Sequence, residues 1–279
     1  MTRTIKVLFL IFIVALFSAC TDDEVTTSEN FVLEGFIVAG TPVNDIKVKG
    51  VSPLNSDEVT SEPLSNAVIV LTHQGSFFDL TFNEATGLYR YDGEDLNIDI
   101  GEEYAIEVTV DNRTATASTL VPTKPTGLSL PDSLLQIPTL RLSFTLGDEI
   151  NDLFFNERIT LTWDEAPGQS FYVVIETLET ELDPILPPEI PEEAVELLSS
   201  FRFISEPSET GQFEIIGVAL ETYGRHVAKV FTVNQEYVDL FENAEQDSRD
   251  LNEPPSNVFN ALGIFTSFAV DSVTFDVLR

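Results

Sequence analysis

The chain has 279 residues with 47 acidic side chains against 14 lysines and arginines, a formal net charge of −33. Because so acidic a surface repels polyphosphates, we expect no nucleic-acid binding. Hydrophobic residues make up 43% of the chain, which is enough to build packed cores and excludes a chain that is disordered throughout. At roughly 100–200 residues per domain, the length predicts two domains.

The N-terminus has the features of a secretory signal. Arg3 and Lys6 precede an apolar stretch at residues 7–17, and small residues follow it. The stretch is too short to cross a bilayer as a stable anchor. We therefore predict a signal peptide over residues 1–19, whose removal leaves a still more acidic mature chain.

The signal ends in the residues FSAC, and this segment resembles a bacterial lipobox. In a lipobox the cysteine is lipidated and becomes the first residue of the mature protein. Cys20 is the only cysteine of the chain, so it has no disulfide partner within it. We expect Cys20 to carry a lipid that tethers the protein to a membrane; the alternative is a plain secretory signal with an incidental cysteine.

Residues 20–30 are too hydrophilic to pack and read as a lipidated tether. The acidic cluster Asp22, Asp23 and Glu24 resembles the surface-export signals of outer-membrane lipoproteins. This resemblance implies a lipid-anchored protein of the outer membrane that faces the cell exterior. The alternative is a periplasm-facing lipoprotein with an ordinary solvated tether.

Residues 31–122 show the pattern of an all-β domain. Short β-branched or aromatic runs occur at residues 31–38 and 67–71, and in residues 104–110 apolar side chains alternate with more polar ones. Turn-forming residues recur at strand-length spacing between Pro63 and Pro122. We expect a β-meander within an N-terminal β-sandwich over residues 31–122.

Two prolines, Pro122 and Pro125, stand close together after this region and cannot continue a central strand. They predict a linker at residues 123–126.

The second half, residues 127–279, resumes the β pattern. Strands are predicted at residues 140–144, 159–163 and 171–176, and two closing strands at residues 261–268 and 273–277. A strand ending in Trp163, a short loop and a strand containing tyrosine resemble the opening of a fibronectin III-like sandwich. Trp163 is then expected to fill the space between two sheets.

Helical segments interrupt this half at two places. Pro191 begins a predicted short helix over residues 192–200, with acids in its first turn. Residues 235–246 carry an apolar stripe at helical spacing, which predicts an amphipathic helix. The fold class is therefore mainly β, with two β-sandwich domains, immunoglobulin-like or fibronectin III-like, and one or two short helices in the second.

Several short motifs together resemble one family. They are FVLEG at residue 31, PLSNAVIV at residue 63, GLY at residue 87, GEEY at residue 101, and PPSNVFNALGIF at residues 254–265. They are similar to the Bacteroidota outer-membrane lipoproteins grouped as domain of unknown function 4249, over essentially the whole mature chain. Ala261 departs from the pattern, since a second glycine is usual there.

This resemblance implies an outer-membrane lipoprotein with an N-terminal immunoglobulin-like or carboxypeptidase-regulatory-like sandwich. Such proteins are often associated with TonB-dependent transporters. The family supplies no catalytic residues to carry over, and its biochemical activity is not established.

The residues that enzymes use are sparse. The two histidines are His73, in a predicted turn, and His226, and a paired metal site would have to recruit them from different domains. No zinc-protease, nucleophile-elbow or phosphate-loop motif is present. A hydrolase that uses two carboxylates is the remaining enzymatic alternative, but with 47 acids, chance proximity is expected.

Two acidic clusters offer hard oxygen ligands for a structural calcium ion, with Asp148 and Asp152 in one and Asp247 and Asp250 in the other. Neither has the glycine that an EF-hand loop requires, and the alternative is a pair of solvated acidic loops. We expect no other cofactor or metal.

We therefore expect a non-enzymatic surface lipoprotein, accessory to a TonB-dependent transporter in ligand capture or uptake. A structural or adhesive lipoprotein of the cell envelope is the alternative.

Overall fold

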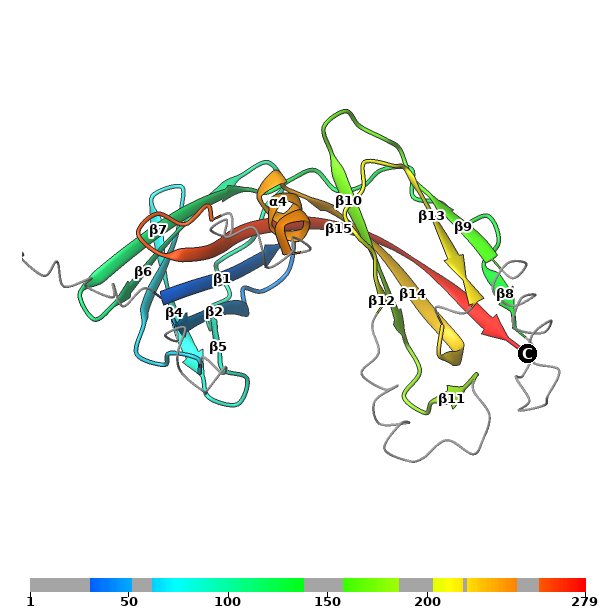
Figure 1. The fold of residues 1–279 in the computed structure, drawn as a ribbon, viewed down its shortest axis with the longest axis horizontal. Helices are drawn as coiled ribbons and strands as arrows, with labels where there is room; N and C mark the ends of the chain where they lie inside the picture. Colours follow the sequence, from blue (N-terminus) through cyan, green and yellow to red (C-terminus); the bar gives the residue numbers. More distant parts are fainter. Residues whose placement is uncertain (1–30, 52–61, 138–157, 186–202, 218–219, 245–255) are drawn as a thin grey trace, which may run out of the picture. The chain divides into compact units, whose positions relative to one another are not determined.

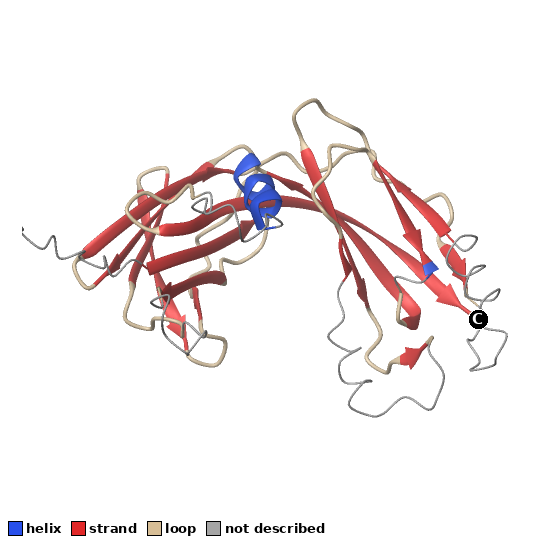
Figure 2. Cartoon of the chain, in the orientation of Figure 1, coloured by secondary structure: helices blue, strands red, loops and turns tan. Residues whose placement is uncertain are grey.

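A computed structural model of the protein describes residues 31–51, 62–137, 158–185, 203–217, 220–244 and 256–279. Residues 31–279 form one compact unit. The prediction of a mainly β fold with sandwich packing and a short helix is confirmed, as Figure 2 shows. Among the described residues, no helix is long and apolar enough to cross a membrane.

The strands of the first half are β1 (Phe31–Val38), β2 (Asp45–Gly50), β3 (Val68–His73), β4 (Ser76–Asn83), β5 (Leu88–Arg90), β6 (Glu103–Val110) and β7 (Arg113–Leu120). The second half contains β8 (Leu134–Gln136), β9 (Arg158–Thr162), β10 (Ser170–Thr177), β11 (Asp183–Pro184), β12 (Phe203–Ile204), β13 (Gln212–Ile216), β14 (Thr222–Val233), helix α4 (Gln235–Ala244) and β15 (Leu262–Leu278).

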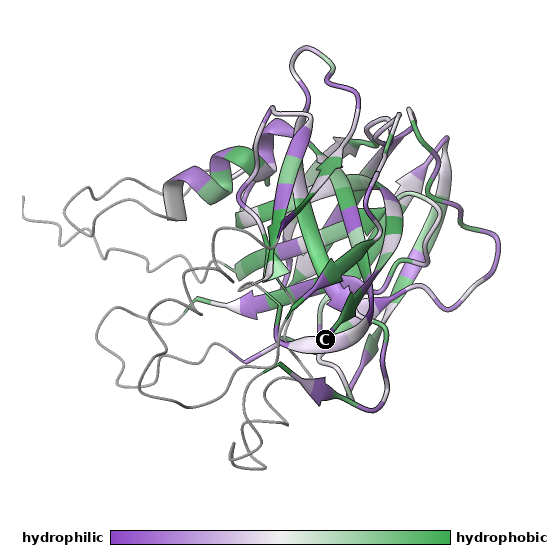
Figure 3. Ribbon diagram, turned by 90° about the vertical axis from the view of Figure 1, so that its right-hand side faces the viewer, coloured by the Kyte–Doolittle hydropathy of each residue, from purple (hydrophilic) through white to green (hydrophobic). Residues whose placement is uncertain are grey.

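The first sandwich follows from period-two alternation. In β1 and β6 every second residue is buried, so each strand turns one apolar face inward. Figure 3 shows hydrophobic and hydrophilic residues alternating along strands of the fold. The strands β15-β1-β2-β5 and β4-β3-β6-β7 run in this order and enclose one apolar core. Leu33, Leu71 and Tyr104 are fully buried in it.

The predicted meander is wrong in one respect. β3, β4 and β5 follow one another as antiparallel neighbours, but β6 pairs with β3 and not with β5. Residues 91–102 separate β5 from β6, and a connection of this length lets the chain cross back to the free edge of β3. Spacing along the sequence predicts that strands exist, but not which edge each strand joins.

The second sandwich packs the strands β12-β10-β14-β15 against the separate pair β9-β13. Trp163 directly follows β9, is 7% exposed and contacts the ring of Phe171 edge-on at 5.7 Å between centroids. The prediction that Trp163 belongs to the core is confirmed.

The two predicted closing strands are a single strand. β15 spans 17 residues, and its middle, Ala269–Ser272, continues to pair with β14 where the sequence predicts a break. Its first part, Leu262–Phe268, also pairs in parallel with β1. Figure 1 shows β15 running beside β1 at one end and beside β14 and β8 further on. The polar pair Asp271 and Ser272 does not end the strand, because backbone pairing with β14 continues through it.

Helix α4 forms where the apolar stripe predicts it. Tyr237 and Val238 on this helix pack on an aromatic cluster that includes Tyr172, Phe231 and Phe268. The ring of Tyr237 meets that of Phe268 edge-on at 5.1 Å between centroids. This packing buries the outer face of strands β10, β14 and β15 that the second core leaves uncovered.

Asn234, immediately before α4, links the helix to two distant strands. Its Nδ2 donates to Thr119 Oγ1 at 3.0 Å, to Leu120 O at 3.1 Å and to Ser267 Oγ at 3.2 Å. Its backbone carbonyl accepts from the Tyr237 amide at 3.1 Å. These hydrogen bonds connect the end of β7 to β15. They also give partners to polar groups that are shielded from water.

The first core also draws on the end of the chain, because Val258 and Phe265 are buried among its side chains. The division into a sandwich at residues 31–122, a linker at residues 123–126 and a sandwich at residues 127–279 stays a prediction. Several expectations lie outside the described residues: the signal peptide and tether with Cys20, Asp22, Asp23 and Glu24, the strand at residues 140–144, and the helix at residues 192–200.

Candidate functional site

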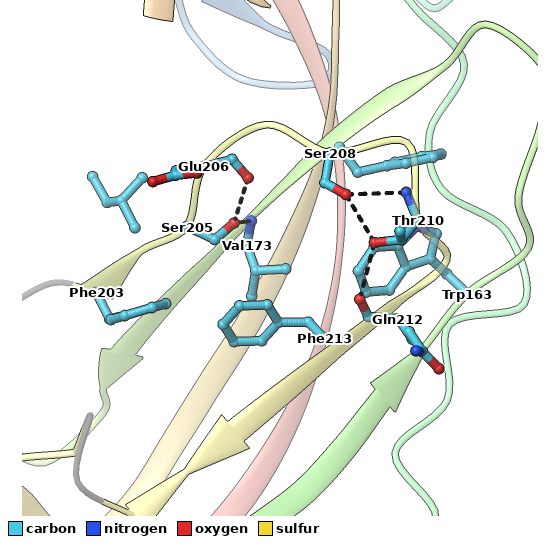
Figure 4. Close-up of a pocket in the computed structure, with 11 residues that line it drawn as sticks. Trp163, Val173, Phe203, Ser205, Glu206, Ser208, Thr210, Gln212 and Phe213 are labelled. Carbon is cyan, nitrogen blue, oxygen red and sulfur yellow. Dashed lines mark hydrogen bonds between the residues drawn. The ribbon is translucent and has the colours of Figure 1, made fainter. Parts of the chain in front are cut away.

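A pocket of about 490 Å³ opens in the second sandwich, where the two layers meet at their edges. Its lining comes from β10, β12, β13, the end of β9 and the segment between β12 and β13: Trp163, Phe171, Val173, Phe203, Ile204, Ser205, Glu206, Ser208, Thr210, Gln212 and Phe213. Figure 4 shows these side chains around the pocket.

The segment at residues 205–211 forms one wall because it is bonded to both layers. Ser208 exchanges two backbone hydrogen bonds with Phe171 of β10, at 2.7 and 2.8 Å. The Ser205 hydroxyl accepts a bond from the Val173 amide at 2.8 Å. Further on, Gly211 O accepts from the Trp163 amide at 2.8 Å. The wall is therefore held to β10 at one end and to the end of β9 at the other.

Aromatic rings form the apolar part of the lining. Phe203 and Phe213 meet at 5.6 Å between centroids, and Trp163 packs on Phe171 beside them. The indole Nε1 of Trp163 is buried and has no hydrogen-bond partner among the described residues. Rings in such an arrangement present an apolar surface to whatever enters.

The polar part of the lining carries hydroxyl groups, one amide and one carboxylate. The hydroxyls of Ser208 and Thr210 are bonded to each other at 2.8 Å (Figure 4). Gln212 and Glu206 complete this side, and the described lining contains no lysine, arginine or histidine. Such groups can orient a ligand, but no carboxylate or imidazole of the described residues is hydrogen-bonded to the hydroxyls to make one of them a nucleophile.

The structure does not bring the two histidines together, as a paired metal site would require. His73 is the last residue of β3 rather than part of the turn, and its ring stacks on Tyr104 at 4.3 Å between centroids. His226 is buried in β14, where its Nε2 lies 3.3 Å from the Thr222 hydroxyl and its Nδ1 lies 3.1 Å from the Gly224 carbonyl oxygen.

In the described part of the chain, no group of three or more metal-ligating side chains is present. The calcium candidates Asp148, Asp152, Asp247 and Asp250 lie outside the described residues, so that hypothesis stays a prediction. Glu206 is the one carboxylate among the described residues that line the pocket, whereas most glycoside hydrolases use two.

The buried imidazole of His226 is expected to make the stability of the fold depend on pH. Burial lowers its pKa below the ordinary 6.5, although the Gly224 carbonyl, Glu179 and Asp276 act in the opposite direction. Because the unfolded chain then binds the proton first, the contribution of His226 to stability is complete above pH of about 6.5 and is lost as pH falls below it.

Urea unfolding at a series of pH values from about 7.5 to 5 tests this expectation. The wild type should lose more stability over that range than His226→Gln, which cannot titrate. Parallel losses in the two proteins would show that His226 carries no such linkage.

Among the pocket residues, sequence reasoning predicted Trp163 as a core residue and placed Phe171 and Val173 in a strand, but it assigned none of them to a site. The signal available was the hydroxyl-rich run SEPSETG at residues 205–211, between the apolar residues Ile204 and Phe213. The same composition is typical of any exposed loop. Only the bonds of this run to β10 and Trp163 make it a pocket wall.

Comparison with known proteins gives one clear relationship. No curated protein matches the chain. A two-domain fibronectin type III segment of chicken tenascin is 10% identical and covers 88% of this chain and 99% of its own, with a TM-score of 0.25. Domains A168–A170 of titin are 11% identical and cover 74% of this chain and 60% of their own, with a TM-score of 0.22. The model of a domain of unknown function (DUF4249) matches residues 17–274, so the chain belongs to the DUF4249 family.

Proposed function

We propose that this protein is a non-enzymatic lipoprotein, anchored in the outer membrane through Cys20 and facing the cell exterior, that helps a TonB-dependent transporter to capture or take up a ligand. The observation that carries the proposal is the lone cysteine at the end of a short apolar signal segment. A lipid on Cys20 explains both its position and its lack of a disulfide partner.

Three features support binding rather than catalysis. The described residues form β-sandwiches, the open pocket has an aromatic lining, and its hydroxyl groups are bonded to no carboxylate or imidazole of the described residues. The strong negative charge keeps such a protein soluble and away from nucleic acid. The role needs no cofactor, and a structural calcium ion would act only on loop geometry.

The test is an affinity pull-down of the tagged full chain from gently solubilised outer membranes, followed by mass spectrometry. Membranes that contain the untagged protein serve as the control. Recovery of a TonB-dependent transporter in stoichiometric amount is the expected result. Recovery of the lipoprotein alone would overturn the accessory role and favour a structural or adhesive one.

A further inference from the structure

We propose that the pocket between β10, β12 and β13 binds a small uncharged organic molecule with an apolar body and hydrogen-bonding substituents. The inference deepens the ligand-capture role and rests on it. Its test is made on the isolated protein and does not involve a transporter.

The size of the pocket fits such a molecule. Small-molecule sites commonly enclose about 300–1,000 Å³, and this pocket encloses about 490 Å³. Phe203 and Phe213 are only partly buried, so their rings remain available on the pocket side. A flat apolar body placed against them would remove both rings from water, which favours binding.

The lining also offers unused hydrogen-bonding capacity. The side-chain amide of Gln212 bonds to no described residue and can both donate and accept. The Ser208 hydroxyl accepts from the Thr210 amide at 3.1 Å, and the Thr210 hydroxyl donates to the Gln212 carbonyl at 3.4 Å. With Ser208 then donating to Thr210, each hydroxyl oxygen keeps one lone pair for a ligand. These groups would fix the orientation of a ligand that carries hydroxyl, amide or amine groups.

Charge decides the class of ligand. None of the described residues that line the pocket is cationic, so a carboxylate or phosphate that binds against them would lose water without gaining a counter-ion from them. The carboxylate of Glu206 and the net charge of −33 add repulsion. The net negative charge would attract a cationic ligand, but among the described lining residues the ligand would find one carboxylate, Glu206, on an exposed residue where an ion pair contributes little. An uncharged molecule avoids both the loss of water from a charged group and the repulsion by the acidic protein.

Two dyes that differ in one charged group test this assignment. N-Phenyl-1-naphthylamine is uncharged, and 8-anilino-1-naphthalenesulfonate adds a sulfonate to the same rings. Trp163 is the only tryptophan of the chain and lines the pocket, so energy transfer from its fluorescence to the dye reports binding near it. The full chain carrying Cys20→Ala and made without lipid keeps the dyes out of micelles and bilayers.

We expect saturable transfer to the uncharged dye and at least tenfold weaker binding of the sulfonate, measured in about 0.5 M salt so that general repulsion is screened. Thr210→Phe fills the pocket and should weaken binding of the uncharged dye at least tenfold. The matched control is Thr114→Phe on β7, since Thr114 is also exposed and its hydroxyl also lies against another hydroxyl, that of Thr109, at 2.9 Å. It should change the affinity less than twofold.

Absence of transfer, equal affinity for the two dyes, or equal effects of the two substitutions would overturn the assignment. If dye binding behaves as expected but the pull-down recovers no transporter, the pocket stands and the accessory role fails. If the transporter is recovered and the dye does not bind, the role stands and this pocket is not its ligand site.

Discussion

Replacing Gly263 with alanine is expected to destabilise the protein by about 2–6 kcal/mol, a large part of the roughly 5–15 kcal/mol that stabilises an ordinary domain. A Cβ on Gly263 would lie 1.9 Å from the carbonyl oxygen of Leu33, which is backbone and cannot move aside. The φ of +114° at Gly263 is also a conformation that residues with side chains rarely adopt. Backbone strain and overpacking each cost about 1–3 kcal/mol.

The effect should be global because of where the contact lies. Leu33 and Gly263 are partners in the parallel pairing of β1 with β15, which joins the beginning of the fold to its end. Phe265, two residues further on, is fully buried in the first core. Separating the two strands would therefore open that core.

Gly50→Ala is the matched control. Gly50 also lies in a strand, β2, but a Cβ there would meet no atom within 4 Å. Chemical unfolding of the two variants and the wild type, followed by circular dichroism, measures the difference. Gly50→Ala should stay close to the wild type, and a Gly263→Ala protein of equal stability would show that β1 and β15 do not approach as described.

Replacing Cys20 with alanine is expected to move nearly all of the protein from the membrane fraction to the soluble fraction. Each buried methylene of an acyl chain contributes about 0.8 kcal/mol to membrane binding, so the loss of the lipid removes the anchor. The change is read by membrane fractionation and immunoblotting, and the lost acyl mass by mass spectrometry.

Thr21→Ala, at the neighbouring position, is the control for this substitution. It leaves the cysteine in place and should keep the protein in the membrane fraction with its lipid. A Cys20→Ala protein that remained in the membrane fraction would contradict the lipid anchor and, with it, the location on which the proposed function depends.

Much of the fold could be predicted because the relevant signals are local. The alternation in residues 104–110 recurs as the burial pattern of β6, and the helical stripe over residues 235–246 recurs as α4. The structure explains the glycine of the motif Gly263-Ile264-Phe265, which belongs to the family resemblance. Only glycine fits against the backbone of Leu33. The pocket could not be predicted, because its aromatic residues come from four segments of the chain. How close these segments lie in the fold does not follow from their separation along the sequence.

Local patterns in the sequence predicted strands β1, β3, β6, β9 and β10, helix α4, several turns, the burial of Trp163 and the large negative charge. They did not single out β14, the 12-residue strand that pairs with both β10 and β15. The predicted properties follow from the period of the hydrophobic residues, from turn-forming residues and from composition. All of these can be read from residues that are close together in the chain. The return of β6 to β3, the unbroken course of β15 and its pairing with β1 from the other end of the chain are visible only in the folded chain. Backbone hydrogen bonding is nearly the same at any strand edge, so the choice of partner depends on which side chains pack together once the whole chain is folded.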